Sequence, residues 1–191
     1  MIFPACSQSI LNAYDEKEFC EMNQDMCVPC GEGILNIRVG AIILKDGHFL
    51  MVRNDKNDYY YSVGGRIKFG ETAQEAVVRE VYEETGVRMD IDHLGFVLEN
   101  YFIADEQEKL GKEVYELAFF FYMKMPKDFE PVCYSFTEDD HKEYLEWVSP
   151  NEPKTIYPEF FRTDLDINDK SIKHRVYDDR PNTAKITEGD R

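Results

Sequence analysis

The sequence predicts an α/β fold with a mixed β-sheet, because apolar runs typical of strands surround one well-marked helix. The first run, Ile37 to Leu44, is aliphatic and β-branched, and Phe49 to Arg53 resumes an apolar strand. Between them, Lys45-Asp46-Gly47-His48 carries a turn signal, since aspartate and glycine suit tight hairpin turns. We therefore expect these two runs to pair as a β-hairpin.

A short strand of tyrosines and the helix come next. Tyr59-Tyr60-Tyr61 is aromatic, and the alternation of a strand would direct at least one ring to the core. Thr72 and Glu75 fit a capping box, in which each residue binds the backbone amide of the other. The helix should run from about Ala73 to Thr85, where Gly86 can take the left-handed conformation that ends helices.

Further elements follow the helix. Pro158 to Leu165 is typical of a short helix with proline in its first turn. Three other segments are rich in aromatic and aliphatic residues and are separated by polar or proline-containing stretches, which predicts strands at Leu94 to Phe102, Glu113 to Met125 and Tyr144 to Val148.

The chain is expected to hold one domain, residues 34–165, between an N-terminal extension, 1–33, and a polar C-terminal tail, 166–191. Its 191 residues, 43% of them hydrophobic, can bury a sizeable core. No apolar run approaches the roughly 18 residues that span a bilayer, and the N-terminus lacks the pattern of a secretory signal. We therefore expect a cytoplasmic protein without a membrane partner.

The net charge of −16 argues against a nucleic-acid duplex as partner, because binding to polyanions depends on clustered lysine and arginine. Small phosphorylated ligands stay compatible with this charge, since a metal ion and a few arginines reverse the sign locally.

Three carboxylates share one side of the predicted helix. Glu80, Glu83 and Glu84 fall within an arc of about 100°, at roughly 100° per residue. Like charges four residues apart disfavour a helix by roughly 0.2 to 0.5 kcal/mol, so the pattern needs a cation or exposure to water. Mg²⁺ prefers oxygen ligands and is usually held by one or two carboxylates plus substrate phosphates. A solvated acidic face is the alternative, but Gly64-Gly65 and Glu71 in the preceding loop favour a ligand site.

Together these residues resemble the Nudix box of the Nudix hydrolases: G, five residues, E, seven residues, R-E, an aliphatic, any residue, E-E, any residue, G, an aliphatic. The fixed positions are filled in register by Gly65, Glu71, Arg79, Glu80, Val81, Glu83, Glu84, Gly86 and Val87. The resemblance extends over about residues 34 to 150 and implies the Nudix α/β/α sandwich with a mixed β-sheet.

The resemblance also implies an activity. Divalent ions that bridge the oxygens of a phosphoanhydride neutralise charge and activate a bound water. We expect hydrolysis of a pyrophosphate bond in a nucleoside diphosphate linked to another moiety, with Mg²⁺ or Mn²⁺ as cofactor. Glu80 and Glu84 would ligate the metal, with Glu83 as a further ligand or a water-mediated contact.

Other positions of the motif take roles by the same resemblance. Glu71 would lie near the metals and pair with Arg79, while Gly64 and Gly65 would leave room for the diphosphate. The general base stays open between a glutamate of the motif and one from a distant loop.

Carboxylates downstream of the helix are Glu99, Glu116, Glu138 and Glu143. We prefer Glu116 as an additional catalytic residue, because a lone glutamate inside an apolar strand must reach water or a partner. The pieces around Glu99 and Glu116 resemble one bacterial Nudix subgroup, which favours functional roles for both. An exposed strand glutamate is the alternative.

Arginines offer a bidentate fork to phosphate, which makes Arg38, Arg53 and Arg66 candidate substrate-binding residues. Ion pairs with the many acidic side chains are the alternative. Tyr59, Tyr60 or Tyr61 could stack on a nucleobase.

Four cysteines lie near the N-terminus. Cys27 and Cys30 resemble half of a zinc site, but the gaps to Cys20 and Cys6 fit no zinc ribbon, so we do not expect zinc and favour unpaired thiols. Cys133, in a loop, has no evident partner.

Two other functions are alternatives to hydrolysis. A non-catalytic Nudix-fold sensor of a nucleotide or nucleotide sugar usually shows a degraded motif or a DNA-binding segment, and a Nudix-like prenyl diphosphate isomerase needs other motifs. Ser62-Val63 and Lys68 depart from the common family pattern without touching the expected metal ligands. Relatives commonly form homodimers, and this sequence indicates no particular interface. Substrate choice is expected to lie in loops 54–59, 103–112 and 126–143.

Overall fold

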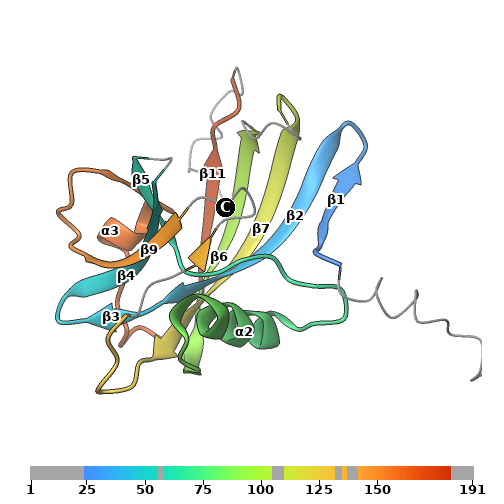
Figure 1. Cartoon of the computed structure of the whole chain (residues 1–191). Coiled ribbons are helices and arrows are strands. Elements are labelled where there is room, and N and C mark those ends of the chain that lie inside the picture. The colour runs from blue at the N-terminus through green and yellow to red at the C-terminus, as the bar shows by residue number, and fades with distance from the viewer. Residues whose placement is uncertain (1–23, 56–57, 105–109, 132–134, 137–141, 182–191) are drawn as a thin grey trace, which may run out of the picture.

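The computed structural model describes residues 24–55, 58–104, 110–131, 135–136 and 142–181 (Figure 1). The helices are α2 (Ala73–Thr85) and α3 (Phe160–Thr163). The strands are β1 (Cys27–Cys30), β2 (Gly33–Ile42), β3 (Leu44–Lys45), β4 (His48–Asn54), β5 (Tyr59–Ser62), β6 (Asp90–Ile103), β7 (Glu113–Lys124), β8 (Ser135–Phe136), β9 (Lys142–Val148), β10 (Thr155–Tyr157) and β11 (Lys173–Asp178).

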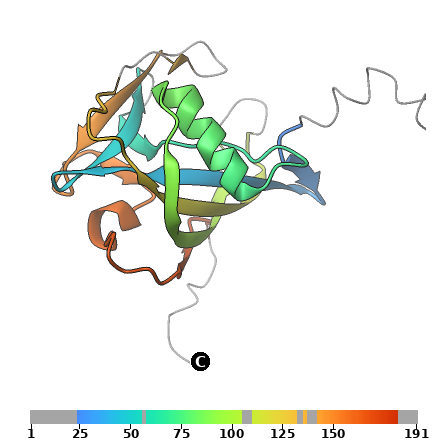
Figure 2. The ribbon, with the colours of Figure 1, turned by 90° about the horizontal axis from the view of Figure 1, so that it is seen from below.

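The described strands form two sheets, which confirms the mixed α/β fold. One sheet has the order β1-β2-β7-β6-β11, and it combines parallel pairs, β2 with β7 and β11 with β6, with antiparallel ones. The other has the order β10-β5-β4-β9-β8, with β3 beside β4. The sheets diverge from each other in Figure 1, and α2 crosses the strands in Figure 2.

Two hydrophobic clusters bury opposite faces of the strands, since successive side chains of a strand point to opposite sides. On β4, Leu50 and Val52 join the cluster beneath α2, whereas Phe49 and Met51 join the cluster that contains Phe160 and Phe161 of α3. The strands are therefore covered by α2 on one side and by α3 on the other.

Local chemistry sets the ends of α2 as expected. The Thr72 hydroxyl accepts from the amide of Glu75 at 3.2 Å, and the Glu75 carboxylate accepts from the amide of Thr72 at 2.9 Å. Gly86 closes the helix with φ of 72°.

The predicted hairpin is wrong for most of its first strand, Ile37 to Leu44. The turn forms at Asp46 and Gly47, whose φ values are 50° and 76°, but only Leu44–Lys45 pairs with β4. The preceding residues continue as β2, which pairs in parallel with β7. A turn determines only the pairing next to it, whereas β2 gains burial on both faces from a central place in the other sheet.

The polar tail expected from Asp166 contains structure. Lys173–Asp178 forms β11, which pairs in parallel with β6 at the sheet edge. An edge strand needs backbone hydrogen bonds on one side only, so a polar composition suffices, and Arg175 adds an ion pair with Asp164 at 2.8 Å. At the other end, β1 lies within the segment expected to be an N-terminal extension.

The remaining predicted elements are confirmed within small shifts of their ends. The short helix near Pro158 is limited to Phe160–Thr163. Of the three tyrosines of β5, Tyr60 enters the core, with 7% of its surface exposed. None of the helices in the described ranges is long and apolar enough to cross a bilayer.

Candidate active site

The loop before α2 runs along the edge of β2. The amide of Val39 donates to the carbonyl of Gly65 at 2.9 Å, and the amide of Ala41 donates to the carbonyl of Val63 at 2.8 Å. Gly64 has φ of 140°, and a Cβ there would lie 2.2 Å from the carbonyl oxygen of Val39. Only glycine therefore allows this approach of loop and strand.

Two glutamates of α2 contact the paired glycines. A Cβ on Gly65 would lie 2.5 Å from the carboxylate of Glu80, whose side chain is 14% exposed. The Gly64 amide donates to Oε1 of Glu84 at 2.8 Å. The missing side chain of Gly65 thus makes the space that Glu80 occupies, whereas the backbone amide of Gly64 holds the carboxylate of Glu84.

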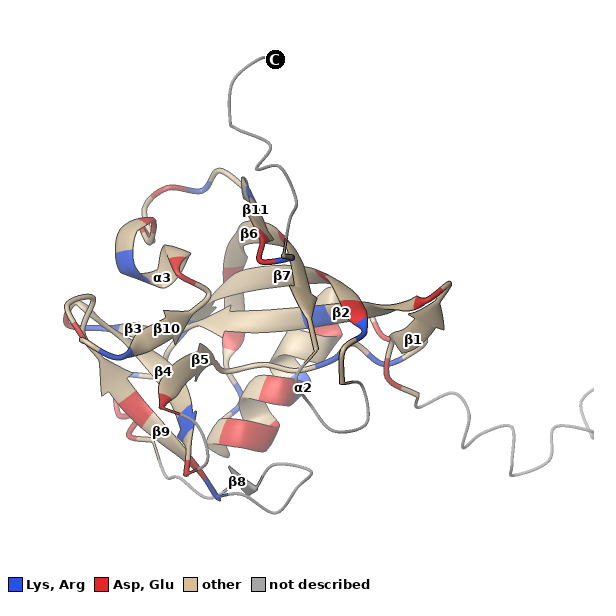
Figure 3. Ribbon diagram, turned by 90° about the horizontal axis from the view of Figure 1, so that it is seen from above, with Lys and Arg blue, Asp and Glu red and all other residues tan. Residues whose placement is uncertain are grey.

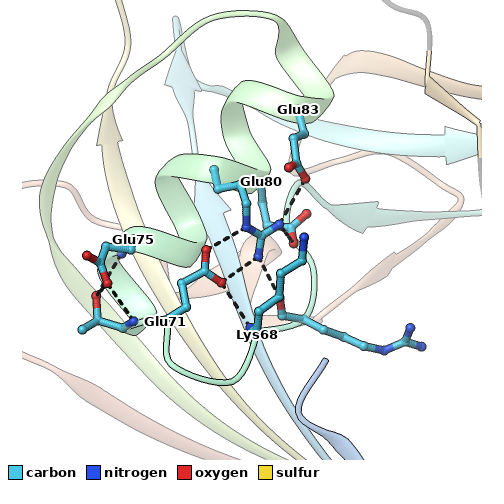
Figure 4. A network of polar contacts seen from close by, with 8 residues as sticks. Lys68, Glu71, Glu75, Glu80 and Glu83 are labelled. Carbon is cyan, nitrogen blue, oxygen red and sulfur yellow. Dashed lines mark hydrogen bonds and ion pairs between the residues drawn. The ribbon is translucent and has the colours of Figure 1, made fainter. Parts of the chain in front are cut away.

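Arg79 donates to three carboxylates of the motif, those of Glu71, Glu80 and Glu83, which Figure 4 labels. Its Nε and Nη2 donate to the two oxygens of Glu71 at 2.7 and 2.9 Å. Its Nη1 donates to Glu80 at 2.6 Å and to Glu83 at 3.1 Å, and Nη2 also donates to the carbonyl of Arg66 at 3.0 Å. The guanidinium holds the pKa of Glu71 below its ordinary value. Arg79 therefore fixes the loop to the helix through a bidentate pair.

Glu80 and Glu84 place two carboxylates in a buried environment that has little compensating positive charge. Burial raises the pKa of Glu80, against the hydrogen bond from Arg79. Burial also raises the pKa of Glu84 well above its ordinary value, and the neighbouring charges of Glu143 and Glu80 add to this effect. A cation at this place would remove the repulsion. Figure 3 shows the acidic residues along α2.

A divalent ion fits this donor set. In the described part of the chain, no group of three histidine, cysteine, aspartate or glutamate side chains is already arranged around a common point for a metal. Mg²⁺ usually takes one or two protein carboxylates and completes its shell with water and phosphate oxygens. Glu80 and Glu84, close to each other and short of positive charge, meet that need.

Arg38 and Arg66 lie beside this cluster. They oppose each other where the loop bridges to β2. Arg38 lies 3.8 Å from the carboxylate of Glu116 and acts to lower the pKa of both Glu80 and Glu84, against the larger effect of burial. Its position therefore connects the glutamates of α2 with a strand glutamate.

Two predicted substrate contacts have other partners in the structure. Glu99 accepts from the hydroxyl of Tyr115 at 3.0 Å and lies 2.8 Å from Nε2 of His174. Arg53 donates to Glu146 at 2.9 and 3.0 Å, as in the ion-pair alternative. Neither of these contacts involves the Nudix motif.

The fold brings Glu143 of β9 close to the glutamates of α2. It accepts from the hydroxyl of Tyr61 at 2.6 Å, and its charge helps to raise the pKa of Glu84. Sequence reasoning named Glu143 only as a secondary candidate, because its approach to Glu84 depends on how β9 packs. Asn36, which donates to Glu116 at 2.8 Å, was missed, although its polarity inside an apolar strand was a usable signal.

Several cysteine and glutamate predictions lie outside the described residues, namely those for Cys6, Cys20, Cys133 and Glu138. Cys27 and Cys30 are free thiols on β1. Residues three apart on a strand point to opposite faces, so β1 directs these two sulfurs away from each other.

Comparisons with known proteins agree with the motif. The chain is 38% identical over 61 residues to a MutT-like protein of Streptomyces ambofaciens, covering 32% of this chain and 40% of that protein. It is 31% identical over 132 residues to an ADP-ribose pyrophosphatase of Methanocaldococcus jannaschii, covering 58% and 73%. It is 35% identical over 69 residues to the NAD-capped RNA hydrolase NudC of Haemophilus influenzae, covering 32% and 26%. The MutT-like protein and NudC are thus matched over less than half of their lengths.

Solved structures of a NUDIX hydrolase and of an ADP-ribose pyrophosphatase are also similar to this chain. A MutT NUDIX hydrolase from Burkholderia pseudomallei has a TM-score of 0.45 at 22% identity, covering 62% of this chain and 85% of that one. An ADP-ribose pyrophosphatase from Streptococcus suis has a TM-score of 0.44 at 14% identity, covering 74% and 98%. The family model of the NUDIX domain matches residues 35–169. Because this match covers most of the chain, the chain belongs to the Nudix family.

Proposed function

We propose that the protein is a pyrophosphohydrolase that uses Mg²⁺ or Mn²⁺ to cleave a nucleoside diphosphate linked to another moiety, releasing a nucleoside monophosphate or another phosphorylated product. The observation that carries this proposal is the placement of Glu80 and Glu84 against Gly64 and Gly65, with too little positive charge around them. That arrangement suits a divalent cation and the phosphates it brings.

Glu80 and Glu84 would hold the metal, and Glu83 would contact it directly or through water. A bound divalent ion supplies charge neutralisation on the anhydride oxygens and a more acidic water. Gly64 and Gly65 would give the diphosphate access to the backbone. Arg79 would keep the loop in place through Glu71, so its contribution is to positioning.

The general base is proposed among the glutamates near Glu84. Two contacts support Glu143 as the base. Its charge acts on Glu84, and the hydroxyl of Tyr61 orients its carboxylate. A glutamate of the motif, such as Glu83, is the second candidate. A base must lie within hydrogen-bond reach of the water it activates, so substitution of each to glutamine separates them.

The substrate is proposed to be a small nucleotide-type compound. A relative named ADP-ribose pyrophosphatase makes ADP-ribose the first compound to test. The test is release of nucleoside monophosphate or phosphate from ADP-ribose, nucleoside triphosphates, dinucleoside polyphosphates, nucleotide sugars and NADH, with Mg²⁺, with Mn²⁺ and with EDTA. We expect metal-dependent release from at least one compound.

The competing function is a non-catalytic sensor of a nucleotide or nucleotide sugar. Calorimetry on the same panel separates the two, because a sensor would bind a compound that it leaves intact in the presence of metal. The acidic chain makes a nucleic-acid duplex an unsuitable partner. A homodimer is tested by light scattering during size-exclusion chromatography.

A further inference from the structure

A group of polar side chains interrupts an apolar face of the sheet formed by β2, β7 and β6. Glu116 on β7 lies in register with Asn36 on β2 and with Asn100 on β6. On the same face of β7, Val114 and Ala118, the residues two before and two after Glu116, are buried, at 4% and 2% exposure. We call Asn36, Arg38, Asn100 and Glu116 the polar belt.

The polar belt lies on the face of β7 that points away from α2. Phe121 and Met123 belong to the cluster beneath α2, whereas Ala118, Phe120 and Tyr122 belong to the cluster with α3. Because strand side chains alternate, Glu116 shares the side of Ala118 and Phe120. The packed face of α2 therefore lies on the other side of the sheet, whereas the carboxylates of Glu80 and Glu84 lie within electrostatic reach of Arg38 in the polar belt.

The polar belt is largely buried, so its polar atoms need partners. The Glu116 side chain is only 13% exposed, and Asn36 is 6% exposed. Both contacts of Glu116, from Nδ2 of Asn36 at 2.8 Å and from Arg38 at 3.8 Å, use Oε2. Oε1 of Glu116 has no hydrogen-bond partner among the described residues, and it is not among their fully buried atoms, whereas Oδ1 of Asn36 is buried without a partner. Oε1 of Glu116 is therefore open to a donor from solvent or from a ligand.

Arg38 connects the polar belt to the candidate active site. It opposes Arg66, the residue after Gly65, and Gly65 contacts Glu80. A molecule whose diphosphate lies at Gly65 would therefore extend its attached group along β2 toward Glu116. The belt is near neutral, since Arg38 balances the one carboxylate, so it suits an uncharged group that donates hydrogen bonds.

We propose that Glu116, held by Asn36 and Arg38, is a specificity-determining residue that accepts hydrogen bonds from the group attached to the diphosphate. The ligand chemistry is a neutral moiety with O–H or N–H donors, which a ribose diol or the amino edge of a purine supplies. Glu116 takes no part in metal binding or proton transfer. This inference rests on the proposed pyrophosphohydrolase function and replaces the expected catalytic role of Glu116.

The test pairs a change in the protein with a change in the substrate. Values of kcat/KM are measured for wild type and Glu116→Gln on adenosine and guanosine compounds from the panel. Each compound is matched with its 2′-deoxy, 3′-deoxy or, for guanosine, inosine analogue, which lacks one donor. We expect Glu116→Gln to lower kcat/KM by about 10- to 100-fold for the parent compound and by much less for the analogue without the contacted donor. The sensitive analogue then identifies ribose or base as the source.

Controls keep the outcomes distinct. Glu113→Gln changes an exposed carboxylate of the same strand and should leave all ratios unchanged. If Glu116→Gln does not fold, Glu116→Asp keeps the charge beside Arg38 and withdraws the oxygens by one methylene. An equal loss on parent and every analogue, or no loss on any, would overturn this inference while leaving the proposed function standing. Absence of hydrolysis by the wild type would instead overturn the proposed function, and this inference with it.

Discussion

The glutamates of α2 and the glutamate of β7 differ in how their charges are balanced. Around Arg79, one guanidinium serves Glu71, Glu80 and Glu83, and nearby Glu84 receives a backbone amide. In the polar belt, one carboxylate faces one arginine and one amide. The first place is short of positive charge and suits a cation, whereas the second is neutral and suits a hydrogen-bond donor. Charge balance therefore assigns different chemistry to glutamates that look alike in the sequence.

The largest expected effect comes from Glu84→Gln, which removes a charge from the proposed metal site. We expect kcat to fall by at least on the order of 100-fold, with the fold retained. The measurement is product release under saturating Mg²⁺, with circular dichroism to check folding. Glu75→Gln on the same helix is the control, because glutamine also completes a capping box. A Glu84→Gln variant with near-normal turnover would remove Glu84 from the metal site.

Gly65→Ala tests the fit between loop and helix. The added Cβ would lie 2.5 Å from the carboxylate of Glu80, so that side chain must move. Because displacement by about 1 Å can cost on the order of 100-fold in rate, we expect a 10- to 100-fold loss of kcat/KM. Gly47→Ala is a matched control for adding a methyl group, since a Cβ there meets nothing within 4 Å, although its positive φ costs some stability. Equal activity of Gly65→Ala and wild type would contradict the tight placement of Glu80.

The raised pKa of Glu84 predicts a pH-dependent cost in the metal-free protein. Its folded pKa lies above the ordinary 4.5, so the folded state binds the proton more strongly and loses stability as pH rises from 4.5 through the folded pKa. Relative to Glu84→Gln, wild type in EDTA should become progressively less stable as pH rises above 4.5. Thermal unfolding of both proteins measures this difference, and Mg²⁺ should reverse it in wild type only. If the stability difference between wild type and Glu84→Gln did not change with pH, the raised pKa of Glu84 would be refuted.

The smallest expected effect comes from Arg38→Gln in the polar belt. It leaves Glu116 without its balancing charge, but Arg38 is 38% exposed and 3.8 Å away, so water screens the pair. We expect a loss of about 0.5 to 1 kcal/mol in the free energy of unfolding, measured with urea. The double variant with Glu116→Gln should lose less than the sum of the single changes. Strict additivity would show that the two side chains do not interact.

Short-range chemistry made much of the fold predictable. The capping box at Thr72 and Glu75 and the terminal Gly86 define α2 through contacts within a few residues, and the predicted and observed bounds coincide. The strands after the helix were also predictable, because apolar and aromatic composition marks them locally. The motif likewise brought Glu71 and Arg79 together in prediction and structure.

Pairing across long separations was not predictable in this way. Asn36 and Glu116 are 80 positions apart and meet only because β2 and β7 pair in parallel. The hairpin prediction failed for the same reason, because β2 pairs with the distant strand β7 and not with the strand that follows it in the sequence. The amino-acid sequence alone determined the helix and its row of carboxylates, since these depend on local hydrogen bonds and periodicity. The tertiary structure alone decided which face Glu116 occupies and that Glu143 approaches Glu84, because strand pairing and packing between sheets are settled by burial of the whole core.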